Sequence, residues 1–483
     1  MSDSRSDQAI PDDPVTRPWF FAGIGGSGML PLATILKGLG AQVAGSDRSF
    51  DQGRTPEKRG WLERQGFALF PQDGSGISSA EQILVASAAV EDSVPEIVRA
   101  RDLGCLRVSR AELLADLFNR APLSLAVGGT SGKSTVTGML GWIMTQAGRN
   151  PTIMNGAVMK NFVSPDTPFA SARVGAGEVF VSEVDESDGT IALYRPSVAV
   201  LLNVSLDHKS MEELRGLFGS FVRTGGTAII NCDDGEARHL AAGAQRAITF
   251  GVENQQASIG IEPGTIVEHA SAIEALLVDR RVDQGHSLRL SMPGRHNLSN
   301  ALAAVAAADA AGVSVHDATL ALHSFAGLAR RFDIVGTSGS GITVIDDFGH
   351  NPEKARATLR TLKAPSSSTV GRVIAFFQPH GYGPLQQMGE ELARTFAQEL
   401  GPQDLTILCD PVYYGGTVDR SQGSERIVNL IREAGGQAEH IAGREDCAVR
   451  IAEIARPGDR IVVMGARDDT LSLFAAQLLA RLA

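Results

Sequence analysis

Short apolar runs alternate with amphipathic stretches along nearly the whole chain, and this alternation restricts the fold more than any other sequence feature. The apolar runs are typical of buried strands, and the stretches between them carry apolar residues at helical spacing. Chains of this kind build parallel sheets covered by helices. We therefore predict an α/β protein that begins with a strand over residues 19–22, a helix over about 28–40 and a second strand over 42–45.

The chain has 483 residues, more than one hydrophobic core usually organises, so several domains are expected. The helix over 110–119 ends before Pro122, which places a first boundary near Arg120. A second boundary is predicted near Phe332. Residues 233–293 show little helical periodicity, and we interpret them as an antiparallel excursion, a segment of antiparallel strands inserted into the otherwise parallel fold.

Composition excludes several classes of protein. Hydrophobic residues make up 43% and charged residues 20% of the chain, which is typical of a folded globular protein and not of a disordered or membrane-spanning one. The net charge of −11, without a local basic patch, argues against nucleic acid as a partner. The 4 cysteines lie far apart, which fits neither a disulfide framework nor a zinc site, and the polar residues 1–19 cannot serve as a secretory signal. These features predict a cytoplasmic protein without membrane insertion.

A glycine-rich loop lies between an apolar strand over 123–127 and a helix that starts near Ser134. Strand, glycine loop and helix in this order wrap backbone N–H groups around phosphates. Lys133 would reach the β and γ phosphates, and the Ser134 hydroxyl would hold Mg²⁺. The strict phosphate-loop pattern is not met, because Val127 stands where the first glycine belongs. The alternative interpretation is a glycine-rich turn with a solvated lysine.

A second glycine-rich turn follows the first strand and comprises Gly23, Gly25, Gly26, Ser27 and Gly28. Asp47 ends the next strand, where a carboxylate can hold a ribose hydroxyl. The turn fits a dinucleotide, a nucleotide-sugar diphosphate, or merely the close packing of a helix on a sheet.

Polar residues follow several other predicted strands, at the sheet edge where ligands bind in parallel folds. The carboxylates of 183–188 suit a hard cation, and Asp207 with His208 follows the next strand. Asn297 is either a helix N-cap or an amide that reads a base. Arg330 and Arg331 are either surface charges or a clamp for phosphoryl groups. Two further segments, 346–352 and 378–382, end strands of the last domain.

Taken in order, these motifs resemble the Mur ligase family over about residues 20–475, and most closely the branch that adds L-alanine to UDP-N-acetylmuramate. The resemblance implies a Rossmann-like N-terminal domain that binds the UDP substrate (20–120), a central P-loop ATPase-like domain (121–332) and a Rossmann-like C-terminal domain that binds the amino acid (333–483). Residues 1–19 are expected to form a disordered tail. The implied reaction is an ATP-dependent amide synthesis of peptidoglycan precursors through an acyl phosphate, with ATP and Mg²⁺ as cofactors. The implied partners are small molecules, UDP-linked muramic acid and an amino acid, and the chain would act as a monomer or dimer.

The resemblance also implies a role for each motif. The catalytic residues would be Lys133, Glu183, His208, Asp347 and His350. The metal ligands would be Ser134, Glu183 and His208. ATP would contact Gly129, Thr130, Ser131, Gly132, Lys133, Ser134, Thr135, Asn297, Arg330 and Arg331. The UDP substrate would contact Gly23, Gly25, Gly26, Ser27, Gly28, Ser46 and Asp47.

The chain departs from the family pattern at several positions. Ser131, Phe348 and Asn351 replace a histidine, a tyrosine and a histidine, and Arg467 stands at a usual glycine. Gly381 and Pro384 replace two arginines near the expected amino-acid site, and neither can clamp a carboxylate as a guanidinium does. The acceptor is therefore open: a different amino acid, a peptide as in muropeptide recycling, or none in a catalytically altered nucleotide-binding regulator. A nicotinamide oxidoreductase would leave the ATP loop and the acidic segments without a role.

Overall fold

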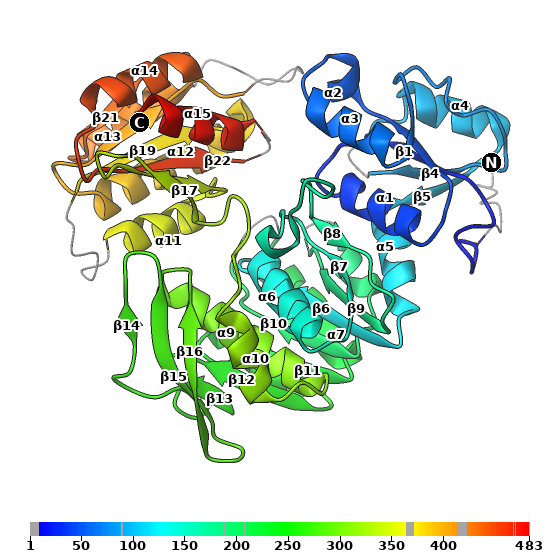
Figure 1. Ribbon diagram of the computed structural model, residues 1–483, viewed down its shortest axis with the longest axis horizontal. Coiled ribbons are helices and arrows are strands. Elements are labelled where there is room, and N and C mark those ends of the chain that lie inside the picture. Colours follow the sequence, from blue (N-terminus) through cyan, green and yellow to red (C-terminus); the bar gives the residue numbers. More distant parts are fainter. Residues whose placement is uncertain are drawn as a thin grey trace. The chain divides into compact units, whose positions relative to one another are not determined.

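The computed structural model describes residues 9–87, 90–186, 189–206, 209–363, 371–412, 423–466, 468 and 470–482. These residues form two compact units, which are treated separately below. The first unit comprises the chain up to Glu262 together with Leu276–Leu288 and Ser299–Ala326. The second comprises Pro263–Ala275, Arg289–Leu298 and the chain from Gly327 onward. Figure 1 labels the helices and strands.

The first unit begins with a five-stranded parallel sheet of strand order β3-β2-β1-β4-β5. Its strands are β1 (Trp19–Ala22), β2 (Val43–Ser46), β3 (Ala68–Phe70), β4 (Ile83–Ala86) and β5 (Leu106–Ser109). Its helices are α1 (Met29–Gly38), α2 (Arg48–Asp51), α3 (Pro56–Arg64), α4 (Pro95–Leu103) and α5 (Arg110–Asn119). The alternation of strand and helix that the sequence predicts for this segment is confirmed.

The described end of the predicted tail packs against this domain. The Trp19 ring is buried, and its Nε1 donates to the carbonyl of Pro14 at 2.8 Å. Arg120 donates to the carbonyl of Pro11 at 3.1 Å, and Arg17 donates to the carbonyl of Glu81 at 2.8 Å. These contacts hold the described part of the predicted tail against the domain, while residues 1–8 lie outside the described residues.

A second sheet follows in the order β14-β15-β13-β12-β11-β10-β6-β9-β7-β8, with β16 paired to β15. Its strands are β6 (Leu123–Gly128), β7 (Thr152–Met154), β8 (Ala172–Arg173), β9 (Val179–Glu183), β10 (Val198–Leu201), β11 (Thr227–Asn231), β12 (Ala247–Gly251), β13 (Ile259–Ile261), β14 (Val267–Glu268), β15 (Ile273–Asp279) and β16 (Gln284–Leu290). The helices of this part are α6 (Lys133–Gln146), α7 (Met211–Thr224), α8 (Gly235–Leu240), α9 (Arg295–Ala310) and α10 (Val315–Leu322). Short 3₁₀ turns occupy Lys160–Phe162, Thr190–Leu193 and Ala241–Gly243.

The antiparallel excursion predicted over 233–293 begins later than expected. β12 and β13 still pair in parallel, and antiparallel pairing starts only between β13 and β15. The reason is the short helix α8, whose first turn is capped by the side chain of Asp234. This helix carries the chain back so that β12 runs in the same direction as β11.

The second unit contains a six-stranded sheet of order β17-β18-β22-β19-β20-β21, parallel except for the β17–β18 pair. The strands are β17 (Asp333–Thr337), β18 (Thr343–Asp347), β19 (Val373–Gln378), β20 (Leu405–Leu408), β21 (Ala438–His440) and β22 (Arg460–Gly465). The helices are α11 (Pro352–Lys363), α12 (Tyr382–Glu399), α13 (Ser424–Glu433), α14 (Arg444–Ile454) and α15 (Leu471–Arg481). The four strands predicted for this segment correspond to β18, β19, β20 and β22.

Within the first unit, one hydrophobic core runs from the first sheet into the second. Phe118 of α5 is fully buried, and its ring lies edge-on to Phe180 at 5.6 Å and to Tyr194 at 5.2 Å. Trp61 of α3 adds a polar contact, since its indole donates to the carbonyl of Asp166 at 2.8 Å. The two parts of this unit are therefore held together by shared burial.

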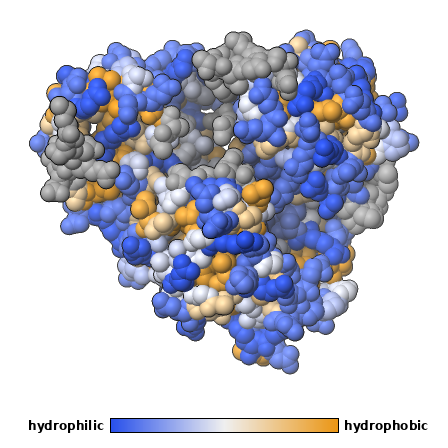
Figure 2. All heavy atoms as spheres, turned by 180° about the vertical axis from the view of Figure 1, so that it is seen from behind, coloured by the Kyte–Doolittle hydropathy of each residue, from blue (hydrophilic) through white to orange (hydrophobic). Residues whose placement is uncertain are grey.

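The face of the molecule in Figure 2 carries mostly hydrophilic residues with scattered hydrophobic ones between them. Among the described residues, no helix is both long enough and apolar enough to cross a membrane.

We expect Phe118→Ala to lower the free energy of unfolding of the first unit by about 3–5 kcal/mol, because it removes a fully buried ring and leaves a cavity. Tryptophan fluorescence during urea unfolding measures this, since the 3 tryptophans, Trp19, Trp61 and Trp142, all belong to the first unit. Leu39→Ala is the control: Leu39 is 44% exposed, and its loss should change stability by less than about 0.5 kcal/mol. Equal effects of the two substitutions would contradict the shared core.

Candidate active site

The phosphate loop predicted from the sequence lies between the end of β6 and the start of α6. Gly129 and Gly132 adopt φ angles of +138° and +87°, which side chains other than glycine rarely tolerate. A Cβ atom at Gly129 would lie 2.9 Å from Cβ of Leu202, and one at Gly132 would lie 2.7 Å from Oδ1 of Asn300. Both glycines are therefore required by conformation and by space, as a loop that wraps around an anion demands.

Lys133 folds back over this loop. Its Nζ donates to the carbonyl oxygen of Gly129 at 2.8 Å and to Oε2 of Glu186 at 2.8 Å. Burial opposes the charged form of the amine, but the negative charges of Glu186, Asp185 and Glu183 outweigh it, and the pKa of Lys133 is raised. Lys133 is thus held as an ammonium ion beside the carboxylates, the state required of a group that binds phosphate.

Ser134 and Glu183 meet directly across neighbouring strands. The Ser134 hydroxyl donates to Oε2 of Glu183 at 2.7 Å, because β9 pairs with β6 and brings Glu183 opposite Val127. A Cβ atom at Gly156 would lie 2.1 Å from Oε1 of Glu183, so only glycine leaves room for this carboxylate. A hydroxyl and a carboxylate oxygen are ligands that Mg²⁺ accepts, so these residues fit the cation.

The predicted metal site cannot be completed from the described residues. Asp207 and His208, together with Ser187 and Asp188 of the acidic segment, lie outside them. Among the residues that are described, no group of three or more His, Cys, Asp or Glu side chains is arranged to hold a metal ion. The role of His208 remains a prediction.

Asn155 is a site residue that the sequence reasoning missed. It is fully buried after β7, and its Nδ2 donates to the backbone carbonyl of Ser134 at 3.0 Å. Its Oδ1 accepts the N–H of Ala157 at 3.0 Å. Asn155 thereby ties the first turn of α6 to the β7 segment, a contact between distant parts of the chain that no sequence pattern reveals.

The glycine turn of the first sheet is held by residues at the end of β2. The N–H groups of Gly23 and Ile24 donate to the carbonyl of Ser46 at 2.8 and 3.0 Å. Oδ2 of Asp47 accepts the N–H of Gly25 at 2.8 Å, and Oδ1 accepts the N–H of Ser49 at 2.8 Å. Asp47, expected to hold a ribose hydroxyl, therefore first fixes the shape of the turn.

Arg110 is a second residue that sequence reasoning missed. A Cβ atom at Gly28 would lie 3.1 Å from Cδ of Arg110 and 3.4 Å from its Nε, so the side chain lies against the glycine turn. The capping box of Ser109 and Glu112 fixes the start of α5 and with it the position of Arg110. Within the described part of the chain its guanidinium makes no hydrogen bond or ion pair. A strand followed by Ser-Arg-x-Glu is the only signal that could have pointed to it.

Asn297 is not the N-cap residue that was one of the two interpretations of the sequence. α9 begins at Arg295, so Asn297 lies in its first turn rather than before it. The side chain is buried, and its Nδ2 donates to the carbonyl of Pro293 at 2.7 Å. The helix starts early because the positive φ of Gly294 already turns the chain.

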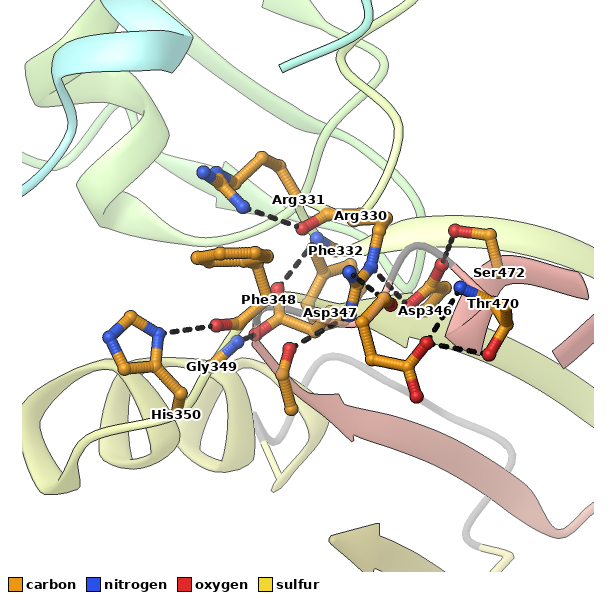
Figure 3. A network of polar contacts seen from close by, with 12 residues as sticks. Arg330, Arg331, Phe332, Asp346, Asp347, Phe348, Gly349, His350, Thr470 and Ser472 are labelled. Atoms are coloured by element: carbon orange, nitrogen blue, oxygen red, sulfur yellow. Dashed lines mark hydrogen bonds and ion pairs between the residues drawn. The ribbon is translucent and has the colours of Figure 1, made fainter. Parts of the chain in front are cut away.

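In the second unit, the side chain of Arg330 is held by contacts with residues of the same unit (Figure 3). Its guanidinium donates to the carbonyls of Gly465 at 2.8 Å and Asp468 at 3.1 Å, and it pairs with Asp346 at 3.4 Å. Only 11% of the side chain is exposed. Arg330 thus joins β18 to β22, and Arg331 packs its guanidinium 4.4 Å from the centre of the Phe348 ring. The contact of both arginines with ATP stays a prediction.

Asp347 makes several hydrogen bonds with the backbone and side chains around it. Its Oδ2 accepts the N–H of Phe332 at 2.8 Å, and its Oδ1 accepts the N–H of Gly349 and the hydroxyl of Thr358, both at 2.8 Å. Its exposed fraction is 7%. Asp347 thus organises the turn after β18 (Figure 3), and its catalytic role stays a prediction.

His350 lies beside this turn and is held neutral. Burial and the nearby positive charge of Lys354 lower the pKa of His350 to about 3, with smaller contributions from His380 and Arg331. Its Nδ1 lies 2.9 Å from the carbonyl oxygen of Phe348, and because a carbonyl only accepts, Nδ1 carries the proton. Nε2 is therefore the acceptor atom, and the ring meets that of His380 edge-on at 5.1 Å.

The segment after β19 lacks the side chains of an anion clamp. Gly381 has a φ of +145°, and a Cβ atom at Gly383 would meet nothing within 4 Å. Gln378, at the end of the strand, donates to Asp468 at 2.7 Å, and Arg444 pairs with the same carboxylate at 3.1 Å. Arg467 lies outside the described residues.

Comparisons with known proteins agree with this arrangement. Three family models match the chain in order: the Mur ligase family catalytic domain over residues 20–121, the Mur ligase middle domain over 127–308 and the Mur ligase glutamate ligase domain over 330–467. The chain belongs to the Mur ligase family. The domain boundaries predicted from the sequence near Arg120 and Phe332 stay predictions.

Several proteins resemble this Mur ligase over nearly its whole length. A UDP-N-acetylmuramate--L-alanine ligase of Sinorhizobium medicae is 35% identical over 96% of both chains. A ligase of the same name from Agrobacterium fabrum is 36% identical over 93% of this chain and 94% of its own. Among solved structures, the UDP-N-acetylmuramate-alanine ligase MurC of Thermotoga maritima matches with a TM-score of 0.80 at 25% identity, covering 96% of this chain and 99% of that one. A murein peptide ligase of Psychrobacter arcticus shares the fold with a TM-score of 0.71 at 24% identity, covering 96% of this chain and 98% of that one.

We expect the imidazole of His350 to remain neutral from pH 5 to pH 8, because its pKa is lowered from the ordinary 6.5 to about 3. Between these two values the unfolded chain binds a proton that the folded chain does not. The contribution of His350 to stability is therefore present above pH 6.5 and decreases as the pH falls towards 3. Proton NMR of the histidine ring signals measures the titration, and His350→Asn assigns the signal. A His350 signal that titrates near pH 6.5 would contradict the buried neutral ring.

Proposed function

We propose that this Mur ligase is an ATP-dependent enzyme that joins the lactyl carboxylate of UDP-N-acetylmuramate to the amine of L-alanine or another small amino acid. The observation that carries the proposal is the phosphate loop with Lys133 and Ser134 anchored to Glu186 and Glu183. The relatives named for this reaction extend over 96% of the chain, which supports the same substrates here.

In this proposal, each of the three domains binds a different substrate. The central domain binds ATP, with its phosphates on the first backbone N–H groups of α6 and on Lys133. Ser134 and Glu183 would hold Mg²⁺, and the ion would neutralise phosphate charge there. The N-terminal domain binds the UDP moiety at the glycine turn, where Arg110 adds a positive charge, and the C-terminal domain binds the amino acid.

The reaction has two steps, and the protein contributes mainly position and charge. First, an oxygen of the donor carboxylate takes the γ-phosphoryl group of ATP, which forms an acyl phosphate and releases ADP. Then the amine attacks the acyl carbon, inorganic phosphate leaves, and the ammonium proton passes to a base. Lys133 balances the charge that develops on the phosphates.

The acceptor amino acid is the open part of this function. Gly381 and Pro384 leave the segment after β19 without a guanidinium, and Arg444 at the start of α14 is already paired with Asp468. A carboxylate held by one bidentate arginine is a strong and specific contact, so its loss changes which acceptors bind well. The second candidate is therefore a ligase of the same class that joins a different amino acid, or a peptide as in muropeptide recycling. A regulator that binds nucleotide without turnover is the third.

The test of the function is phosphate release by the purified chain with ATP, Mg²⁺, UDP-N-acetylmuramate and each amino acid in turn. We expect release that requires both the donor and an amine, and Lys133→Ala should abolish it without changing the circular dichroism spectrum. Release with a peptide and not with any single amino acid would favour the second candidate. Nucleotide binding without release under any combination would leave only the regulator.

We expect Arg110→Ala to raise the KM for the UDP-linked donor by about 10-fold to 100-fold, since a hydrogen bond to a charged group contributes about 1.5–3 kcal/mol. The KM for ATP should stay within about twofold, because Arg110 lies at the glycine turn of the first sheet and not at the phosphate loop. Initial rates measured with each substrate varied in turn provide both constants. Arg107→Ala is the matched control, because that arginine lies on β5, directly before α5, and pairs with exposed Asp92. Equal effects of the two changes would remove Arg110 from the donor site.

A further inference from the structure

Asn203 lies two residues beyond the end of β10 and contacts the phosphate loop with both ends of its side-chain amide. Its Oδ1 accepts the backbone N–H of Ser131 at 2.8 Å. Its Nδ2 donates to the backbone carbonyl of Ser131 at 3.0 Å. One side chain thus satisfies both backbone groups of a residue at the centre of the loop.

The backbone next to Asn203 strengthens this contact. The N–H of Thr130 donates to the carbonyl of Asn203 at 3.1 Å. The Thr130 hydroxyl lies 3.2 Å from the carbonyl of Ser205 and 3.0 Å from its N–H. Thr130 and Ser131 are therefore paired with residues 203–205 through both backbone and side-chain atoms.

This pairing decides which amides of the loop can bind an anion. In a glycine-rich loop the backbone N–H groups are the phosphate ligands. The N–H of Ser131 is directed at Asn203, so it is not available to a phosphate in this conformation. The first N–H groups of α6, by contrast, have no partner within the helix, and they are the donors that the clamp leaves exposed to an anion.

We propose that Asn203 is a positioning residue that holds the phosphate loop in its binding conformation before nucleotide arrives. Without the clamp, the flexible run from Gly129 to Gly132 samples other conformations, and binding must first order it. The apparent affinity for nucleotide then decreases in proportion to the fraction of molecules in which the loop is already formed. The inference rests on the proposed function in one respect, since it takes the ligand of this loop to be a nucleotide.

The test uses the full chain and the substitution Asn203→Ala. Asn203 is only partly buried, so the variant is expected to fold. In hydrogen–deuterium exchange without nucleotide, we expect the amide of Ser131 to exchange about tenfold faster than in the wild type, because its acceptor is lost. In calorimetric titration with ADP and Mg²⁺, we expect a Kd about tenfold higher. The KM for ATP should rise while the KM for the donor does not change.

Asn203→Asp separates the two bonds of the clamp. It keeps an oxygen that can accept the N–H of Ser131, so this amide should stay protected. It replaces the donor to the Ser131 carbonyl by a second oxygen, so the affinity for ADP should still decrease. This variant also preserves the volume of the side chain, and it carries the test if Asn203→Ala does not fold.

Asn231→Ala is the matched control. Asn231 is buried on β11, and its Nδ2 donates to the carbonyl of Leu202 at 2.8 Å. It therefore makes the same kind of contact to the residue that precedes Asn203. Its removal should lower the melting temperature without changing the exchange of Ser131 or the Kd for ADP. If Asn203→Ala leaves both quantities unchanged, or if Asn231→Ala alters them equally, the positioning role is wrong. A wild-type chain that binds no nucleotide would instead overturn the proposed function, while the exchange measurement would still decide whether the clamp exists.

Discussion

The buried ion pair of Lys133 and Glu186 is the interaction on which the candidate site depends. An ammonium ion at a loop with little exposure to water is stable only beside an opposite charge, and Glu186 is itself almost fully buried. Glu186 can reach Lys133 because β9 runs parallel to β6, so the segments after the two strands leave the sheet at the same edge. Parallel pairing of these strands therefore determines both the charge of Lys133 and the meeting of Ser134 with Glu183.

Close approach of backbone segments is the second constraint, and glycine makes it possible at the points where it matters. Gly156 leaves space for the carboxylate of Glu183, and Gly132 leaves space for Asn300. The polar side chains that surround the loop, Asn155 and Asn203, then fasten its backbone instead of facing solvent. The loop is thus shaped by neighbouring strands more than by its own sequence, which explains how it folds although Val127 breaks the strict glycine pattern.

In the second unit, charged residues of the predicted motifs also hold the fold together. Arg330 and Asp347 belong to segments that sequence reasoning assigned to chemistry, yet their hydrogen bonds hold β18, β22 and the turn after β18 together. In such a motif, some residues fix the conformation of the backbone, and the fixed backbone then positions the neighbouring side chains.

The sequence by itself determined the α/β class, most strands, the two glycine turns and the family, because apolar periodicity and loop composition are local properties of the chain. It did not reveal the contacts of Asn155, Asn203 or Arg110, or the hydrogen bonds of Asp347 and Arg330, because hydrogen-bond partners far apart along the chain follow from strand order. Only the tertiary structure decided which carboxylate oxygens accept hydrogen bonds from backbone N–H groups. It also decided which backbone N–H groups of the phosphate loop are available to an anion. The physical reason is that a polar side chain acts through its partners, and folding, not local sequence, brings those partners together.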